Sequence, residues 1–338
     1  MAVLVTGGAG FIGSHTAVAL HESGRDVVLL DNLHNASAAA VDAVRALTTP
    51  DMAFVEGDLL DASMLDAVFN DYAIDEVIHF AAYKAVGESV AKPLEYYGNN
   101  LGSTIGVAQA MARHEVDRLV FSSSCTVYGQ PDQVPVTEAA PTGAESPYGW
   151  TKYMSEQILA DASAASDLDV ALLRYFNPVG AHRSGTLGED PNGIPNNLVP
   201  FVMQVAVGRL DHVRVFGDDY DTHDGTGVRD YIHVMDLAEA HVAALDGLAN
   251  GSIDGAVPIN VGTGVGYSVL DVVKAASAAV GRELPYEVVD RRPGDIAKTW
   301  AATETAAELL GWRSTRDLEE MVADHWRWQS QNPDGFAS

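Results

Sequence analysis

The sequence of 338 residues contains a single cysteine, Cys125, and only 20 lysines and arginines against 47 aspartates and glutamates. One cysteine excludes an intrachain disulfide and a multi-cysteine metal site, and it is typical of a reducing compartment such as the cytoplasm. The formal net charge of −27 opposes contact with nucleic-acid phosphates and with anionic lipid headgroups. We therefore expect no nucleic-acid partner and no membrane partner.

Long apolar runs are also missing from the chain. No stretch approaches the roughly 20 residues that a transmembrane helix needs, and residues 2–7 already read as a strand, which leaves no room for a secretion signal. Hydrophobic residues make up 47% of the chain and the mean hydropathy is +0.01, the balance of a folded globular protein. The sequence predicts a cytoplasmic protein of one large or two medium domains.

Short β-branched runs alternate with longer helix-like segments in the first half of the chain. This order is typical of βαβ units that build a parallel sheet. After about residue 177 it gives way to a stretch rich in Gly, Pro and Asn. We predict an α/β fold, with a doubly wound, Rossmann-like sheet at 1–176 and a smaller mixed α/β lobe at 177–338, some of whose segments return to the first domain. The predicted strands are 3–6, 27–31, 53–56, 77–81, 119–123 and 170–175, and the predicted helices are 11–22, 64–69, 93–114 and 147–165.

Three glycines follow the first strand at a regular spacing. Gly7, Gly10 and Gly13 lie between that strand and the first helix, which is the context of a dinucleotide-binding turn. Glycine permits a tight turn and a close backbone approach, and the helix amino terminus offers N–H groups to a pyrophosphate. Asp31 ends the second strand, where a carboxylate accepts from a ribose 2′-hydroxyl and repels a 2′-phosphate. The pattern predicts NAD rather than NADP as the cofactor.

A tyrosine and a lysine form a second group with the serines 122–124. Tyr148 and Lys152 are four residues apart in a predicted helix, so both side chains share one face. An ammonium beside a phenol stabilises the phenolate and lowers the pKa of the tyrosine, which can then act as a general base. The serines end the fifth strand, at the carboxyl edge where ligands bind in this fold class. Together with the glycine turn, this group predicts NAD-dependent acid–base chemistry.

In this order the motifs resemble the extended short-chain dehydrogenase/reductase family. Six longer segments are similar to the UDP-glucose 4-epimerases within it, and the resemblance runs from residue 3 to about residue 328. It implies an isomerase that interconverts UDP-glucose and UDP-galactose at C4 through a transient 4-keto sugar, using tightly bound NAD⁺. The six segments are 84–90, 92–100, 173–182, 193–198, 224–236 and 291–295.

The resemblance also implies a role for each site residue. Tyr148, Lys152 and Ser124 are implied as catalytic, with the Tyr148 phenolate taking the proton of the sugar 4-hydroxyl. Arg229 and Arg292 suit a diphosphate because guanidinium groups form fork-shaped, charge-assisted hydrogen bonds. The residues implied for NAD are Gly7, Gly10, Phe11, Ile12, Gly13, Asp31, Asn32, Asn35, Asp58, Leu59, Phe80, Ala81, Lys84, Asn99, Ser122, Tyr148, Lys152 and Tyr175. Those implied for the UDP-sugar are Lys84, Ser124, Tyr148, Asn177, Asn197, Leu198, Phe216, Arg229, Tyr231, Arg292, Asp295 and Thr299.

Two other functions stay open at the level of sequence. A nucleotide-sugar 4,6-dehydratase or decarboxylase shares the fold but needs further acid–base groups. Dehydratases of the family carry Asp-Glu after the strand-end serine or threonine, where this chain has Cys125 and Thr126. A non-enzymatic NAD-sensing protein is the third possibility, because fold does not imply function. Retention of the complete Tyr148, Lys152 and Ser124 group argues against it.

The sequence also bears on the substrate range, on metal binding and on the assembly of the protein. Thr299 precedes Trp300, where many bacterial epimerases of the resembling family carry a bulky tyrosine, so we predict room for N-acetylated UDP-hexosamines such as UDP-GlcNAc and UDP-GalNAc. The eleven histidines show no recognisable metal-ligand spacing, and we predict no metal. The resemblance also implies a homodimer in which the helical segments 101–111 and 154–159 pack across a twofold axis.

Overall fold

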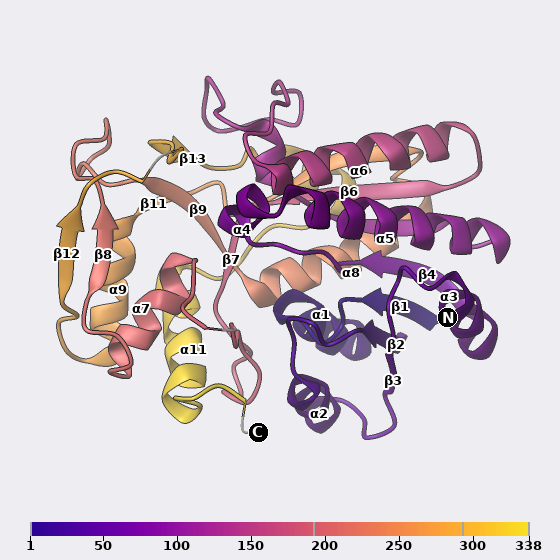
Figure 1. Ribbon diagram of the computed structural model, residues 1–338, viewed down its shortest axis with the longest axis horizontal. Coiled ribbons are helices and arrows are strands. Elements are labelled where there is room, and N and C mark those ends of the chain that lie inside the picture. Colours follow the sequence, from indigo (N-terminus) through magenta and orange to yellow (C-terminus); the bar gives the residue numbers. More distant parts are fainter. Residues whose placement is uncertain (1, 192, 293, 337–338) are drawn as a thin grey trace.

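The computed structural model describes residues 2–191, 193–292 and 294–336. Its centre is a sheet of seven parallel strands in the order β10-β6-β5-β4-β1-β2-β3 (Figure 1). The strands are β1 (Ala2–Thr6), β2 (Asp26–Asp31), β3 (Ala53–Glu56), β4 (Ile74–His79), β5 (Arg118–Ser124), β6 (Asp169–Tyr175) and β10 (Ala256–Val261). The chain order reverses between β1 and β4, and ligands of such sheets bind at the strands' carboxyl ends beside this point.

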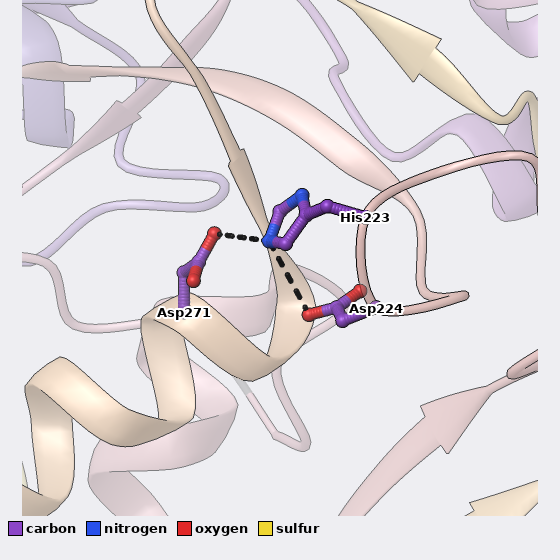
Figure 2. A group of neighbouring side chains, drawn as sticks. All are labelled: His223, Asp224 and Asp271. Carbon is purple, nitrogen blue, oxygen red and sulfur yellow. Dashed lines mark ion pairs between the residues drawn. The ribbon is translucent and has the colours of Figure 1, made fainter.

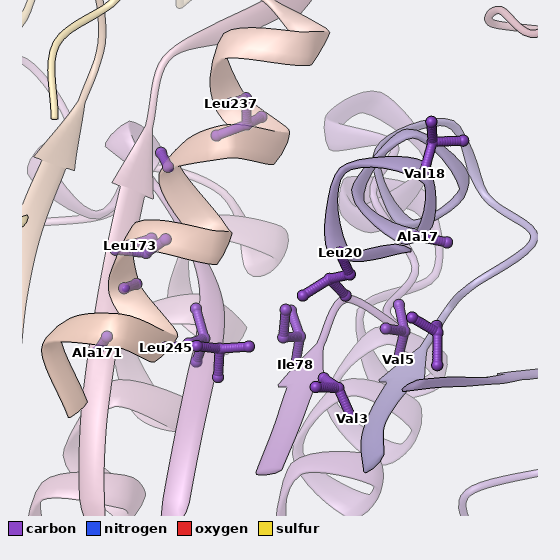
Figure 3. Packing of buried hydrophobic residues seen from close by; sticks show 14 of the residues in the cluster. Val3, Val5, Ala17, Val18, Leu20, Ile78, Ala171, Leu173, Leu237 and Leu245 are labelled. Carbon is purple, nitrogen blue, oxygen red and sulfur yellow. The ribbon is translucent and has the colours of Figure 1, made fainter. Parts of the chain in front are cut away.

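Helices cover both faces of the sheet because alternate strand residues are buried on opposite sides. Val3 and Val5 of β1 pack on one face and Leu4 on the other. The first face is covered by α1 (Phe11–Glu22), α2 (Ala38–Leu47) and α8 (Val234–Asn250). Figure 3 shows Leu20 of α1 and Leu237 of α8 in this core. The second face is covered by α3 (Ala62–Tyr72), α5 (Pro93–Arg113) and α6 (Pro147–Ala164).

The sheet confirms the predicted fold class and corrects several details. It has seven strands rather than six, because β10 returns from the second half of the chain and pairs with β6. β4 spans Ile74–His79 instead of 77–81. Its first half was missed because the acidic Asp75 and Glu76 interrupt the apolar run from which the strand was predicted. The helix predicted at 64–69 is longer at both ends, and α2 was not predicted.

The remaining elements form a smaller unit beside the carboxyl ends of the large sheet (Figure 1). Its strands are β7 (Asn177–Val179), β8 (Val213–Phe216), β9 (Val228–His233), β11 (Gly266–Ser268), β12 (Tyr286–Val289) and β13 (Lys298–Thr299). β9 pairs with β7, β11 and β13, and β8 pairs with β12. The helices α7 (Leu198–Ala206), α9 (Val269–Val280) and α11 (Leu318–Gln331) share one core. The domain boundary at 176/177 stays a prediction.

Three short helices complete the fold. α4 (Val86–Ala91) follows β4, the 3-10 helix η1 (Cys125–Tyr128) follows β5, and α10 (Glu304–Leu310) packs on α8 and β10. Two of these elements therefore extend from the carboxyl edge of the sheet, where the predicted site residues lie. Within the described ranges, no helix combines the length and the apolar composition needed to cross a membrane.

Candidate functional site

The glycine turn after β1 forms a backbone cradle. Gly7 has a φ of +70°, and a Cβ there would lie 2.8 Å from the amide nitrogen of Ala81. A Cβ on Gly13 would lie 2.3 Å from the carbonyl oxygen of Gly7. Gly10 precedes α1 without a side-chain cap, so the first amides of the helix keep their donors for a ligand. The crowding and the free helix terminus fit the pyrophosphate of a dinucleotide.

Asp31 lies at the end of β2 against this turn and is 8% exposed. Its Oδ2 accepts from the Ala9 N–H at 3.1 Å and its Oδ1 from the Leu33 N–H at 2.9 Å. Burial raises the pKa of this carboxyl. Each carboxylate oxygen keeps a second lone pair. Asp31 can therefore accept a hydrogen bond from a ribose hydroxyl while it also binds the backbone of the glycine turn. Asn32 donates through Nδ2 to Asp58 Oδ2 at 3.3 Å, which brings two further predicted residues together.

The loop after β4 passes over the glycine turn and reaches the second unit. The Phe80 N–H donates to the Thr6 carbonyl at 3.0 Å, and Lys84 Nζ lies 3.3 Å from Glu189 Oε1. Glu189 is 5% exposed and was missed by the sequence prediction, because it is one acidic residue in a Gly/Pro/Asn-rich stretch. The other residues implied for NAD follow the same edge: Phe11 and Ile12 begin α1, Asn35 follows β2, Leu59 follows β3, Ala81 follows β4, Asn99 lies on α5, Ser122 on β5 and Tyr175 on β6.

The proposed catalytic residues meet where α6 lies against the end of β5. Ser146 caps α6, since its Oγ accepts from the Gly149 N–H at 3.2 Å. Ser124 lies close enough to the Tyr148 hydroxyl to lower the pKa of the tyrosine. Lys152 Nζ donates to the Ser122 carbonyl oxygen at 2.6 Å. The structure therefore brings Tyr148, Lys152 and Ser124 together, as the spacing in the sequence indicated.

The pKa values in this group correct one expectation from the sequence. Burial raises the pKa of Tyr148 to about 12, and the hydrogen bond with Ser124 opposes that rise. Burial lowers the pKa of Lys152 to about 7, while the charge of Glu156 raises it. The predicted lowering of the Tyr148 pKa is wrong here, because desolvation dominates and the Lys152 amine is turned to a carbonyl. Burial also raises the pKa of the Cys125 thiol to about 12, so this thiol is not a nucleophile at neutral pH.

Residues predicted for the UDP-sugar gather along β9. Asn177 of β7 is paired with Tyr231, and Thr299 of β13 is paired with Arg229. The charge of Arg229 also acts on the Cys125 thiol, directly after Ser124. This half of the substrate set therefore adjoins the catalytic group.

A second substrate group lies at the end of β8. The Arg292 guanidinium carbon is 4.9 Å from the centre of the Phe216 ring, and Arg292 Nε is 3.2 Å from Asp295 Oδ2. Arg291 is directed instead to the Tyr220 ring, 4.0 Å from its guanidinium carbon. The two adjacent arginines therefore have different partners.

The remaining substrate candidates lie at the start of α7, which packs against β8. Asn197 caps α7 and Leu198 is its first residue, on an element separate from β8 and β9. Asn197 is exposed and makes no side-chain cap hydrogen bond, so its amide is available to a ligand. Pro293, within the predicted segment 291–295, lies outside the described residues.

Figure 2 shows His223 between the carboxylates of Asp224 and Asp271. Their ligand atoms lie within 4.8 Å of one another, a grouping that no sequence spacing reveals because Asp271 comes from α9. Asp224 also accepts from Ser268 Oγ at 2.5 Å, and Asp271 from the Ser268 N–H at 2.9 Å. These bonds cap α9 and tie the loop before β9 to it. We assign the group this structural role.

The model of the NAD dependent epimerase/dehydratase family matches residues 3–262. The chain belongs to this family. It is 58% identical over 339 residues to a UDP-glucose 4-epimerase of Bacillus subtilis (strain 168), covering 100% of this chain and 99% of the relative.

Solved structures agree with this assignment. The UDP-glucose 4-epimerase of Bifidobacterium longum, in complex with NAD+ and UDP, has a TM-score of 0.95 at 51% identity and covers 99% of this chain and 100% of that one. The enzyme of Stenotrophomonas maltophila, with NAD and formylated UDP-arabinopyranose, has a TM-score of 0.96 at 49% identity and covers 98% and 99%. The resemblance seen in the sequence is confirmed.

This family member contains one more buried site residue that the sequence prediction missed. Asp230 is 0% exposed and accepts from the N–H groups of Thr263, Gly264 and Ala301 at 2.9, 3.0 and 3.1 Å. It therefore holds two segments, the loop at 263–264 and residue 301, against β9 next to Arg229. Its only signal in the sequence is its position directly after that arginine.

Proposed function

We propose that the chain catalyses the reversible C4 epimerisation of UDP-glucose and UDP-galactose. The observation that carries the proposal is the Tyr148 hydroxyl beside Ser124 at the edge that also holds the glycine cradle. Oxidation of a carbinol carbon needs a proton acceptor beside a hydride acceptor, and this edge offers both positions. The Bifidobacterium longum structure with NAD+ and UDP supports the same cofactor and nucleotide here.

Each residue of the site then has a defined task. NAD, when bound, would supply the acceptor for the C4 hydride and its donor to the other face of the sugar. Tyr148 takes the proton of the 4-hydroxyl as a phenolate and gives it back, so its pKa of about 12 has to fall in the loaded site. Ser124 hydrogen-bonds the same oxygen, and the Lys152 ammonium favours the phenolate form of Tyr148. Arg229 and Arg292 hold the diphosphate through charge-assisted hydrogen bonds. The 4-keto sugar turns about its link to this diphosphate between the two hydride transfers.

The alternatives fit the site less well. A dehydratase needs a carboxylic acid after the strand-end serine, where this chain has Cys125, with a pKa raised to about 12, and Thr126. The Thr126 hydroxyl donates to Ser124 Oγ at 3.0 Å and supports that serine instead. A sensor of NAD has no need of a tyrosine, a serine and a lysine assembled at the cofactor edge. These points favour the epimerase over both.

Acceptance of UDP-GlcNAc and UDP-GalNAc belongs to the same proposal. Thr299 is 7% exposed and is paired with Arg229, the residue assigned to the diphosphate. A threonine here leaves volume that a tyrosine would occupy. This supports room for an acetamido group.

A homodimer is the assembly that the surface supports. α5 and α6 pack against each other and expose Ile105, Trp150 and Met154 at 38%, 37% and 38%. Apolar side chains of this size on two adjacent helices suit a twofold helix contact. Sedimentation equilibrium tests this, and a monomer mass would contradict it. The cytoplasmic location stays a prediction.

Proton NMR of UDP-galactose with the purified chain and no added cofactor tests the function. Anomeric signals of UDP-glucose are expected to appear until equilibrium, because NAD retained in the cradle suffices for every turnover. The heat-inactivated chain serves as the control. If no UDP-glucose forms even after NAD is added, the epimerase proposal is wrong for this sugar pair.

A further inference from the structure

Three buried polar side chains meet behind the proposed catalytic group. Ser123, Glu156 and Arg174 are 0%, 1% and 6% exposed. Ser123 Oγ donates to Glu156 Oε1 at 2.5 Å, and Arg174 donates through Nε to Oε1 at 2.8 Å and through a terminal nitrogen to Oε2 at 2.6 Å. Ser123 and Arg174 are direct partners in the register of β5 and β6, so both side chains leave the sheet on the face toward α6. We call these three residues the strand–helix lock.

The lock lies between the two contacts that join α6 to β5. Ser122, on one side of it, accepts from Lys152 at 2.6 Å. Ser124, on the other side, lies beside the Tyr148 hydroxyl and lowers the pKa of that tyrosine. Lys152 and Glu156 are four residues apart on α6, on successive turns of one helix face. A shift of α6 along β5 would therefore disturb both catalytic contacts at once.

We propose that Glu156 is a positioning residue that fixes the register of α6 against β5, so that Tyr148 and Lys152 reach their serine partners. The role rests on the proposed function, because it acts through the residues assigned to catalysis. The two parallel bonds from Arg174 give the carboxylate one orientation, which a single bond would not do.

The energetics of buried ion pairs support a positional role. A buried pair adds little net stability compared with apolar side chains of the same size, because desolvation of both charges offsets their attraction. Setting a register is the best-attested use of such buried polar groups. The pair is also anchored beyond the helix: Arg174 donates to the Tyr128 hydroxyl at 3.0 Å, which donates to Asn260 of β10 at 2.7 Å. Glu156 thus connects α6 directly to β5 and β6 and, through Arg174, to η1 and β10.

Two variants and one control test this role. Glu156→Gln removes the charge, and Ser123→Ala removes the strand contact while the ion pair remains. Glu76→Gln is the matched control, because Glu76 is also 0% exposed and lies 2.9 Å from an arginine, Arg118, at the amino ends of β4 and β5, on the opposite edge of the sheet. Urea unfolding of all three shows how much stability each variant loses. kcat and KM for UDP-galactose are measured on each with its bound NAD.

The expected result is a fall in kcat of about tenfold to 100-fold in both lock variants, with KM changed less than twofold. Glu76→Gln is expected to keep both constants while losing stability. Removal of the Glu156 charge also lowers the pKa of Lys152 further, so the alkaline limit of activity moves to lower pH in Glu156→Gln alone. A kcat and a pH profile like those of Glu76→Gln would overturn the positioning role.

Two further outcomes are also decisive. If Glu156→Gln does not fold, Ser123→Ala decides, because it leaves the buried charges paired. If the unmodified chain does not epimerise UDP-galactose, the proposed function fails while the lock is tested in crystals of Ser123→Ala. A lengthened Lys152–Ser122 contact there supports the positioning role, and a contact kept at 2.6 Å overturns it.

Discussion

The two sides of the proposed site are built differently. On the α6–β5 side, Ser124 and Lys152 are 8% and 4% exposed and both are hydrogen-bonded within the protein. On the β8–β13 side, the Arg292 side chain is 52% exposed beside Asp295. Buried, bonded groups hold their geometry before a ligand arrives, whereas a long exposed side chain loses rotamer freedom on binding. We therefore infer that the proposed reacting groups are set by folding and that the proposed diphosphate contacts form with the substrate.

Removing one hydroxyl from the buried side gives the largest expected effect. Tyr148→Phe is expected to lower kcat by about 10²- to 10⁴-fold, because it deletes the proton acceptor and leaves the ring in place. KM and the amount of NAD released on denaturation are expected to stay unchanged. NMR rates of UDP-galactose conversion and the absorbance of the released cofactor measure these quantities.

Tyr153→Phe is the matched control for that change. Tyr153 lies on the same helix, packs against Trp150 at 5.9 Å between ring centres, and is not part of the catalytic group. Its replacement is expected to leave kcat within about twofold, as is usual for a change away from the reacting atoms. Undiminished turnover in Tyr148→Phe would show that the α6–β5 side does not supply the reacting group.

A change on the exposed side is expected to act on binding instead. Arg292→Met keeps the length of the side chain and removes charge-assisted hydrogen bonds worth about 1.5–3 kcal/mol. KM for UDP-galactose is expected to rise about 10- to 100-fold with kcat nearly unchanged. Arg291→Met is the control, since Arg291 faces Tyr220 and Asp219. An equal rise of KM in both variants would show that the two arginines share one role.

The sequence predicted what depends on neighbours along the chain. The glycine turn at 7–13 and the helical spacing of Tyr148 and Lys152 are local patterns, and both form as expected. The seven-stranded sheet was only partly predicted, because β10 reaches β6 from the far half of the chain. Local periodicity carries no information on such a pairing.

The partners of the catalytic group were hidden for the same reason. Ser123 and Arg174 are neighbours only through the register of β5 and β6, and Glu189 meets Lys84 only after the second unit folds back. The pKa of Tyr148 was predicted in the wrong direction because desolvation depends on packing rather than on spacing. The sequence motifs therefore predicted where the site lies, but the pKa values of its groups depend on the tertiary structure.

The smallest expected effect comes from Thr299→Tyr, which changes the size of a side chain on the β8–β13 side without changing its charge. Thr299→Tyr adds a ring at a buried position next to Arg229. UDP-galactose turnover is expected to change little, while the activity ratio of UDP-GlcNAc to UDP-glucose falls about tenfold or more, because only the acetamido group needs the lost volume. Thr299→Val keeps the volume and is expected to keep the ratio. An unchanged activity ratio of UDP-GlcNAc to UDP-glucose in Thr299→Tyr would show that another residue limits the size of the sugar. Arg292→Met would then remain the better test of how the β8–β13 side binds its substrate.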